Sequence, residues 1–214
     1  MILTSSPLEI VILLPALIIA FTIHELCHGL AAYGLGDSTA KRDGRLSINP
    51  IRHIDPLGLI FILVAGFGWA KPVMVNPHNL KNPKVDMALI AIAGPLSNFI
   101  MAFVSLMIFV PLLYFWDGMP PTVIRATLTF AQLNIVLGVF NLIPIPPLDG
   151  SKVIAGILPE RIYRALPPVG RYGMLVLLVL MLLGFTGRIL SPIVEAVMTG
   201  FISIAYSIYS FLIF

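Results

Sequence analysis

The sequence predicts an all-α polytopic membrane protein, and composition is the first reason. Apolar residues make up 58% of the 214 residues and charged residues only 11%, whereas soluble domains carry about 25% charged residues. The mean hydropathy is +1.00. Cys27 is the only cysteine. Disordered, collagen-like and disulfide-stapled secreted classes are therefore excluded.

The second reason is the length of the apolar runs. A helix needs about 20 apolar residues to cross a hydrocarbon core of about 30 Å. Residues 57–70 form an apolar run that would reach only about 21 Å as a helix. We therefore expect about five transmembrane helices plus a short re-entrant or β-like segment over residues 57–77, with six crossings as the alternative. The five longer runs cover residues 7–36, 86–116, 122–143, 169–190 and 191–214.

The third reason is the distribution of basic residues, which collect on the cytoplasmic side of membrane proteins. With five crossings, eleven basic side chains share one side, and only Arg125 and Arg188 lie opposite. With six crossings the split is seven against six, which carries no signal. We therefore expect a multi-pass protein of the cytoplasmic membrane, with its N-terminus outside and its C-terminus in the cytoplasm. The eleven are Lys41, Arg42, Arg45, Arg52, Lys71, Lys81, Lys84, Lys152, Arg161, Arg164 and Arg171.

These features indicate a single integral-membrane domain over residues 1–214. Residues from about 7 to 150 carry the motifs described next, and residues from about 169 to 214 add C-terminal helices. The net charge of +3 is small and gathers in two loops, which is typical of membrane orientation rather than nucleic-acid binding. The lipid bilayer is an expected partner and nucleic acid is not, and the sequence specifies no oligomeric state.

A metal-binding motif lies inside the first apolar run. It reads His24-Glu25-Leu26-Cys27-His28. Positions i and i+4 share a helix face, so both imidazoles can reach one metal ion while Glu25 handles a water. The alternative is two histidines that bond only to helix neighbours. The cost of ionisable side chains in a bilayer favours the metal site. His28 lies about 12 Å from the expected helix end at Gly36, on the cytoplasmic half.

Asp149 is the candidate third ligand, because a catalytic zinc ion normally has three protein ligands and an open position. Three prolines, Pro144, Pro146 and Pro147, interrupt the helix that ends near Ile143. Unwound backbone at membrane depth needs cover from protein or a water-filled cavity. With five crossings, this end lies on the same side as His28. The alternative is a plain turn residue, since Leu-Asp-Gly is typical of tight turns.

These motifs resemble those of the site-2 protease family of intramembrane zinc metalloproteases, over most of the chain. The similarity is to short prokaryotic members that lack PDZ or CBS domains. Besides HExxH, the shared motifs are Gly44-Arg45-Leu46-Ser47-Ile48-Asn49-Pro50, His53-Ile54-Asp55-Pro56-Leu57-Gly58, Gly68-Trp69-Ala70-Lys71-Pro72-Val73, Ala93-Gly94-Pro95-Leu96-Ser97-Asn98 and the run from Asn141 to Gly150.

The resemblance implies one Zn²⁺ per chain with the ligands His24, His28 and Asp149. It implies Glu25 as general base and Asn141 as a group that stabilises the transition state. The implied reaction is hydrolysis of a peptide bond in or near a transmembrane segment of another membrane protein, as in regulated intramembrane proteolysis. Two other functions stay open: a metal-ion transporter, since membrane His and Asp also form ion pathways, and a catalytically inactive scaffold.

Several weaker candidates complete the expectations. Cys27 is expected to be a buried small residue rather than a ligand. We expect residues 73–75 to form either an edge strand that a substrate peptide could join or a loop at the membrane interface. Gly94 allows close helix approach. His53 is a candidate to support the metal site from outside it. Polar residues inside the crossings are expected to form interhelical hydrogen bonds or to line a water path, and they are Asn98, Gln132 and Asn134.

Overall fold

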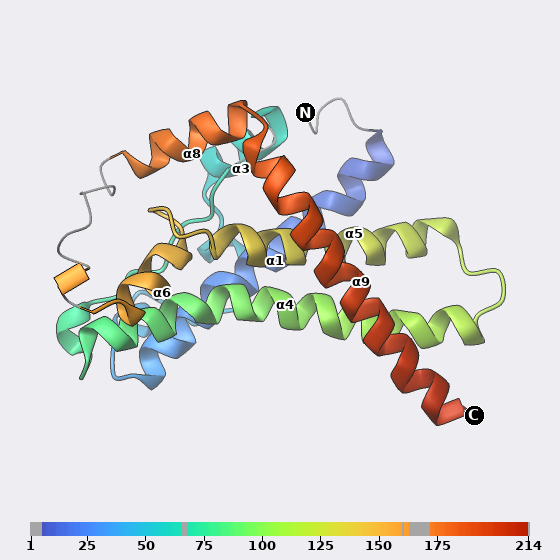
Figure 1. The fold of residues 1–214 in the computed structure, drawn as a ribbon, viewed down its shortest axis with the longest axis horizontal. Coiled ribbons are helices and arrows are strands. Elements are labelled where there is room, and N and C mark those ends of the chain that lie inside the picture. The colour runs from blue at the N-terminus through green and yellow to red at the C-terminus, as the bar shows by residue number, and fades with distance from the viewer. Residues whose placement is uncertain (1–5, 66–67, 160, 163–171, 214) are drawn as a thin grey trace.

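The computed structural model describes residues 6–65, 68–159, 161–162 and 172–213, which form helices and no strands (Figure 1). Four helices are long and apolar enough to cross a membrane. The chain is therefore a multi-pass membrane protein. The four are α1 (Pro7–Gly34), α4 (Pro83–Phe115), α5 (Pro121–Asn141) and residues Gly187–Phe211 of α9 (Phe185–Ile213). The shorter elements are α2 (Thr39–Arg42), η2 (Pro50–Arg52), α3 (Pro56–Ala65), η3 (Pro77–Asn79), α6 (Asp149–Ile157) and α8 (Gly173–Leu182).

Local sequence determines where α1 begins. The Ser6 side chain accepts a hydrogen bond from the Glu9 amide, and the Glu9 carboxylate accepts one from the Ser6 amide. Pro7 occupies the first helical position, where its missing N–H costs nothing. α1 ends near Gly36, whose φ of 108° favours glycine. The predicted first crossing is confirmed to within two residues at its end.

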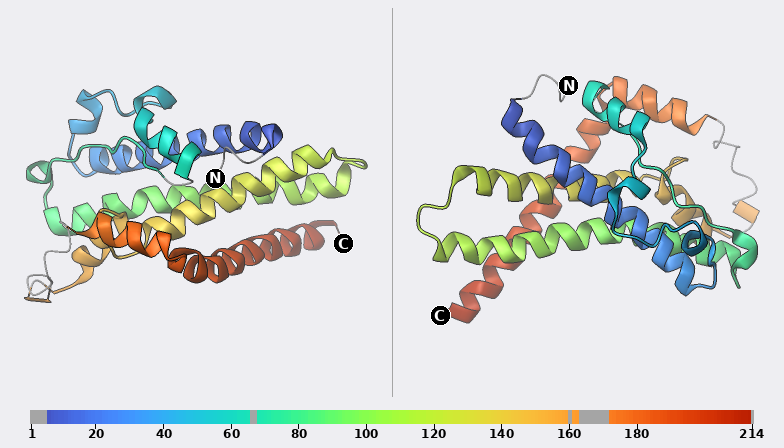
Figure 2. Two further views of the ribbon diagram at one scale, coloured as in Figure 1. Left: turned by 90° about the horizontal axis from the view of Figure 1, so that it is seen from above. Right: turned by 180° about the vertical axis from the view of Figure 1, so that it is seen from behind.

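Helices pack in three layers. α1 lies on one side of the antiparallel α4–α5 pair and α9 lies on the other (Figure 2). Small side chains allow close approach: a Cβ on Gly138 of α5 would lie 2.9 Å from the Phe99 ring of α4. α4 also packs closely against α1 along the stretch that carries the HExxH motif. The buried core between α4, α5 and α9 consists of Ala102, Leu106, Ala131, Ile135, Val139 and Val194.

The expected crossing over residues 169–190 is wrong where the structure describes it. Residues 169–171 lie outside the described residues. The described part forms α8, whose ten residues reach only about 15 Å. The chain then turns at Gly184 (φ 65°), and α9 begins. Among the described residues a single candidate crossing therefore follows α5, and the C-terminal end of α9 lies at the end of the molecule that holds the α4–α5 connection (Figure 1). This arrangement does not support the expected C-terminus on the same side as the cluster.

The expectation for residues 57–77 is confirmed only in part. α3 has ten residues and is too short to cross, so the described residues do not support six crossings. The β-like expectation is wrong. Only an isolated bridge between Ile54 and Ala70 is present in the described part of this segment. The reason is that two backbone amides farther along, those of Val73 and Asn76, donate to carboxylates instead of a neighbouring strand.

Candidate active site

The two histidines of the motif lie on one face of α1, as their spacing requires. Their rings meet edge to face with centroids 4.6 Å apart, and their Nε2 atoms are 3.0 Å apart. Both residues are more than 90% buried, His24 at 5% exposed and His28 at 8%. The predicted convergence of the two imidazoles is therefore present.

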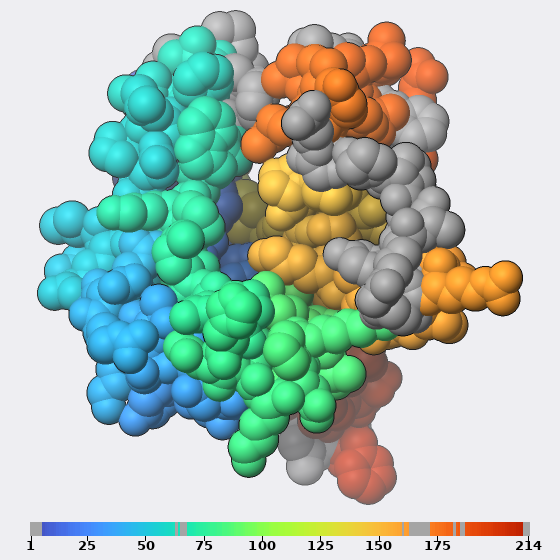
Figure 3. Space-filling model, turned by 90° about the vertical axis from the view of Figure 1, so that its left-hand side faces the viewer, coloured from blue at the N-terminus to red at the C-terminus, as the bar shows by residue number. Residues whose placement is uncertain are grey.

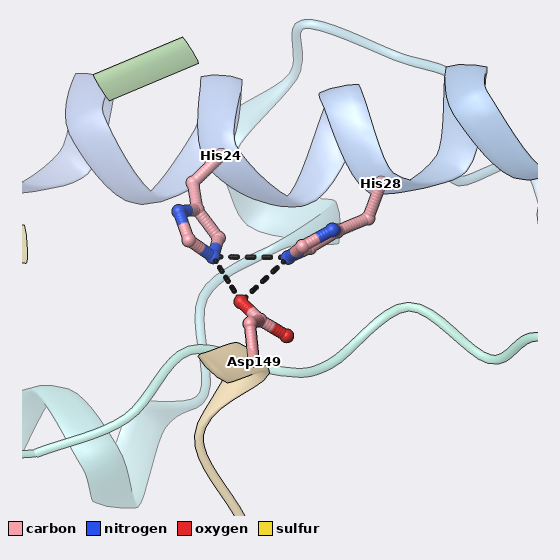
Figure 4. A group of neighbouring side chains, drawn as sticks. All are labelled: His24, His28 and Asp149. Carbon is pink, nitrogen blue, oxygen red and sulfur yellow. Dashed lines mark hydrogen bonds and ion pairs between the residues drawn. The ribbon is translucent and has the colours of Figure 1, made fainter. Parts of the chain in front are cut away.

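Asp149 completes the cluster from α6 (Figure 4). Its Oδ2 lies 3.2 Å from His24 Nε2 and 3.0 Å from His28 Nε2. Asp149 is the first residue of a helix, so the tight-turn alternative is wrong. Glycine at position 150 allows the start of α6 to lie close to the end of α5: a Cβ there would lie 2.2 Å from the Leu142 carbonyl oxygen. The absence of a side chain at Gly150 thus lets the end of α5 hold Asp149 against α1.

The hydrogen-bond partners of the two imidazoles explain why this cluster suits a cation. His28 Nδ1 lies 2.7 Å from the Ile90 carbonyl oxygen, which can only accept, so Nδ1 carries the proton of a neutral imidazole. His28 Nε2 then presents a lone pair to a carboxylate oxygen and to a second imidazole nitrogen. A tetrahedral zinc ion with bonds of about 2.0–2.1 Å places its ligand atoms about 3.3 Å apart. The observed separations of 3.0, 3.0 and 3.2 Å are close to that geometry.

Gly94 of α4 faces the same nitrogens. A Cβ on Gly94 would lie 2.4 Å from His28 Nε2 and 2.6 Å from His24 Nε2. Both distances are far below any ordinary contact of a Cβ atom. Glycine is therefore needed to keep space next to the ligand atoms, which gives the Ala-Gly-Pro motif a role beyond helix packing.

Glu25 is buried at 8% exposed, and its Oε2 accepts a hydrogen bond of 2.9 Å from the Val73 amide. This bond joins the extended chain after Ala70 to the motif helix. Glu25 is not part of the three-residue cluster, and neither is the neighbouring Cys27 among the described residues. The role of Glu25 as general base stays a prediction.

Asn141 lies at the end of α5, and its Nδ2 donates 3.0 Å to the Leu137 carbonyl oxygen of its own helix. In the described part of the chain, no contact connects Asn141 to the cluster. Its role in stabilising the transition state stays a prediction. His53 is fully buried and bonds to the Ser47 carbonyl oxygen over 2.7 Å, which makes it a support of the loop after α2.

Two buried charged residues, Asp37 and Arg45, were not among the predicted site residues. The first, Asp37, accepts hydrogen bonds from Thr39 (amide and hydroxyl), the Asn76 amide and the Asn79 side chain. Burial alone would raise its pKa, but these bonds outweigh burial and lower the pKa of Asp37 to about 2. The second, Arg45, donates to the carbonyl oxygens of Arg52 and Lys71. The hydrogen bonds of Asp37 and Arg45 therefore hold both ends of the extended segment that carries Val73.

The surface is hollowed at the end of the molecule that holds this site (Figure 3). The hollow lies between the chain around residues 60–80 and the chain around residues 140–150, and α1 is visible at its bottom. Polar loops surround this end, including the stretch from Asp37 to Asp55.

The chain is similar to a protein family and to several known sequences. The family model described as "Peptidase family M50" matches residues 117–185. Relatives named "Putative zinc metalloprotease" include the following three. YwhC of Bacillus subtilis (strain 168) is 43% identical over 186 residues, 84% of each chain. Rip2 of Mycobacterium tuberculosis (strain H37Rv) is 30% identical over 77% of this chain and 64% of its own. MJ0611 of Methanocaldococcus jannaschii is 32% identical over 70% of this chain and 72% of its own.

No solved structure matches the chain significantly. The buried His-His-Asp cluster, formed by the membrane-spanning helix α1 and the short helix α6, together with these relatives, defines a membrane zinc metalloprotease. The chain belongs to peptidase family M50, the site-2 protease family.

Proposed function

We propose that the protein is an endopeptidase that cuts a peptide bond in or near a transmembrane segment of another membrane protein, as in regulated intramembrane proteolysis. One zinc ion per chain would be held by His24, His28 and Asp149. The observation that carries this proposal is the mutual approach of their Nε2 and Oδ2 atoms to 3.0–3.2 Å inside a buried cluster.

The proposed chemistry assigns a role to each residue beside the metal. Zinc bound there would polarise the scissile carbonyl and lower the pKa of a water. Glu25, oriented by the Val73 amide, takes a proton from the attacking water and passes it to the leaving amine. Asn141 turns its side-chain amide from the Leu137 carbonyl to the developing oxyanion. The products are a free carboxylate and a free amine, so atoms and charge balance.

The proposed site faces the cytoplasm from the inner half of the cytoplasmic membrane. The basic residues support this orientation, because six of them, from Lys41 to Lys81, lie between α1 and α4, and a seventh, Lys84, lies in the first turn of α4, at the end that holds the cluster. Arg125 lies near the start of α5, at the opposite end, where it pairs with Glu9. In this arrangement residues from about 7 to 150 form the catalytic core of a single domain, and the C-terminal helices pack beside it.

A comparison of membrane proteomes tests the proposed activity. Cells that carry His28→Ala in place of the wild-type protein are expected to accumulate intact, membrane-embedded substrate that wild-type cells cut. The reason is that removing one of three ligands typically abolishes a catalytic zinc site. His78→Ala is the matched control, since His78 is an exposed loop residue and lies outside the cluster.

The outcome also separates the protease from the two other functions that the sequence left open. Identical fragment patterns in wild-type and His28→Ala cells would contradict the protease. A transporter predicts altered cellular metal without new fragments, and an inactive scaffold predicts neither change. Membership in a metalloprotease family favours the protease.

A further inference from the structure

One imidazole and two amide side chains form a line of hydrogen bonds across three helices beside the metal cluster. His24 Nδ1 of α1 lies 2.6 Å from Asn98 Oδ1 of α4. Asn98 Nδ2 donates 2.9 Å to Asn134 Oδ1 of α5, and Asn134 Nδ2 donates 2.9 Å to the Phe130 carbonyl oxygen. Both asparagines are fully buried. The line therefore runs from the face of His24 that points away from the metal to a backbone carbonyl of α5.

The fixed end of this line determines the direction of every bond. The Phe130 carbonyl oxygen can only accept, so the Asn134 amide nitrogen must face it and its Oδ1 must face Asn98. Asn98 then has to present Nδ2 to Asn134, which leaves its Oδ1 facing His24. An oxygen acceptor at 2.6 Å requires the proton of the neutral imidazole to be on Nδ1. His24 Nε2 is thereby left with its lone pair toward His28 and Asp149.

We propose that Asn98, oriented by Asn134, is a positioning residue that keeps the proton of His24 on Nδ1 so that Nε2 is available to the metal. This inference rests on the proposed function of the cluster. His28 has its acceptor built into the backbone, at the Ile90 carbonyl, and needs no such side chain. Among the described residues the acceptor that His24 Nδ1 meets is a side-chain oxygen, Asn98 Oδ1, and not a backbone carbonyl, so His24 relies on Asn98. Partners of metal-binding imidazoles commonly have this role, and their loss typically lowers metal affinity by about 10- to 100-fold.

The consequence of losing the acceptor follows from the distances. Without Asn98 Oδ1, the proton of His24 can move to Nε2 and be donated to Asp149 Oδ2, which lies 3.2 Å away. That hydrogen bond would occupy the two atoms that should bind the metal. Metal binding would then have to expel the proton from Nε2 first, so affinity falls even when the helices remain packed.

The test uses the purified full chain with ¹⁵N-labelled histidine, first free of metal and then titrated with Zn²⁺ against a chelator. The ¹⁵N shifts report which ring nitrogen carries the proton, and the His24 signals are assigned by their loss in His24→Gln. Wild type is expected to show His24 protonated at Nδ1. Asn98→Leu and Asn134→Leu are expected to move the proton of His24 toward Nε2, with a 10- to 100-fold weaker zinc affinity for Asn98→Leu.

Two further variants separate positioning from mere packing. Asn98→Asp keeps an oxygen opposite Nδ1 and is expected to restore the Nδ1 proton and to bind zinc within a few-fold of wild type. Ser97→Ala removes a buried hydroxyl that bonds only to its own helix, at Gly94 O, and should change neither readout. An unchanged proton position and unchanged affinity in Asn98→Leu would overturn the inference while zinc binding by wild type still stands. Failure of wild type itself to bind zinc would instead contradict the proposed function.

Discussion

Replacing Gly94 with alanine is expected to remove the metal from the protein while leaving its helices in place. The new Cβ would lie 2.4 Å and 2.6 Å from the two Nε2 atoms that face Asp149. These nitrogens are part of two buried imidazole rings on a packed helix, so making room for the Cβ must disturb the site. Either the imidazoles rotate away from Asp149 or α4 moves outward, and both changes separate the ligands.

The measurement is zinc per chain after purification, with helical content followed by circular dichroism. Gly94→Ala is expected to fall from about one zinc per chain to nearly none at unchanged helical content. Gly200→Ala in α9 is the matched control, because nothing lies within 4 Å of the added Cβ. Stoichiometric zinc of wild-type affinity in Gly94→Ala would show that the space beside the imidazoles is not needed.

Glu25→Gln is expected to lower the cleavage rate by about 10²- to 10⁴-fold, the contribution typical of a general base. Glutamine keeps an oxygen that can accept the Val73 amide hydrogen bond, so the extended segment after Ala70 should stay in place. It cannot take up a proton from water at neutral pH. Because Glu25 lies outside the ligand cluster, the variant should keep its zinc.

The measurement is turnover of a transmembrane substrate found by the proteome comparison, made with purified enzyme in lipid vesicles, alongside zinc content. Glu9→Gln is the control, since Glu9 pairs with Arg125 at the opposite end of the helices. A Glu25→Gln enzyme within a few-fold of wild type would mean that another group serves as base. Lost zinc in that variant would place Glu25 among the ligands.

Much of the site could be predicted because its residues form short local motifs. His24 and His28 share a helix face by periodicity alone, and their convergence is confirmed. Asp149 could be found because Pro144, Pro146 and Pro147 required an unwound segment next to it. The interhelical hydrogen bond expected for Asn98 and Asn134 is also confirmed, although nothing in the sequence indicated that its other end meets His24.

The rest depended on contacts between distant segments. Asp37 and Arg45 act on backbone groups some 7 to 39 residues away, so no local pattern marks them. Residues 174–183 form an unbroken apolar stretch within the run over residues 169–190, and length alone could not reveal that the chain turns at Gly184. The alternation around Val73 suggested a strand, but Glu25 and Asp37 accept the amide hydrogens that a strand would have shared.

Zinc-edge X-ray absorption on the zinc-loaded, purified wild-type chain tests the central claim most directly. The account predicts a first shell of nitrogen and oxygen atoms only, at about 2.0–2.1 Å, with outer scattering from two imidazole rings. A sulfur neighbour at about 2.3 Å would assign Cys27 as a ligand. That result, or a first shell unchanged in Asp149→Ala, would contradict the His24, His28 and Asp149 site.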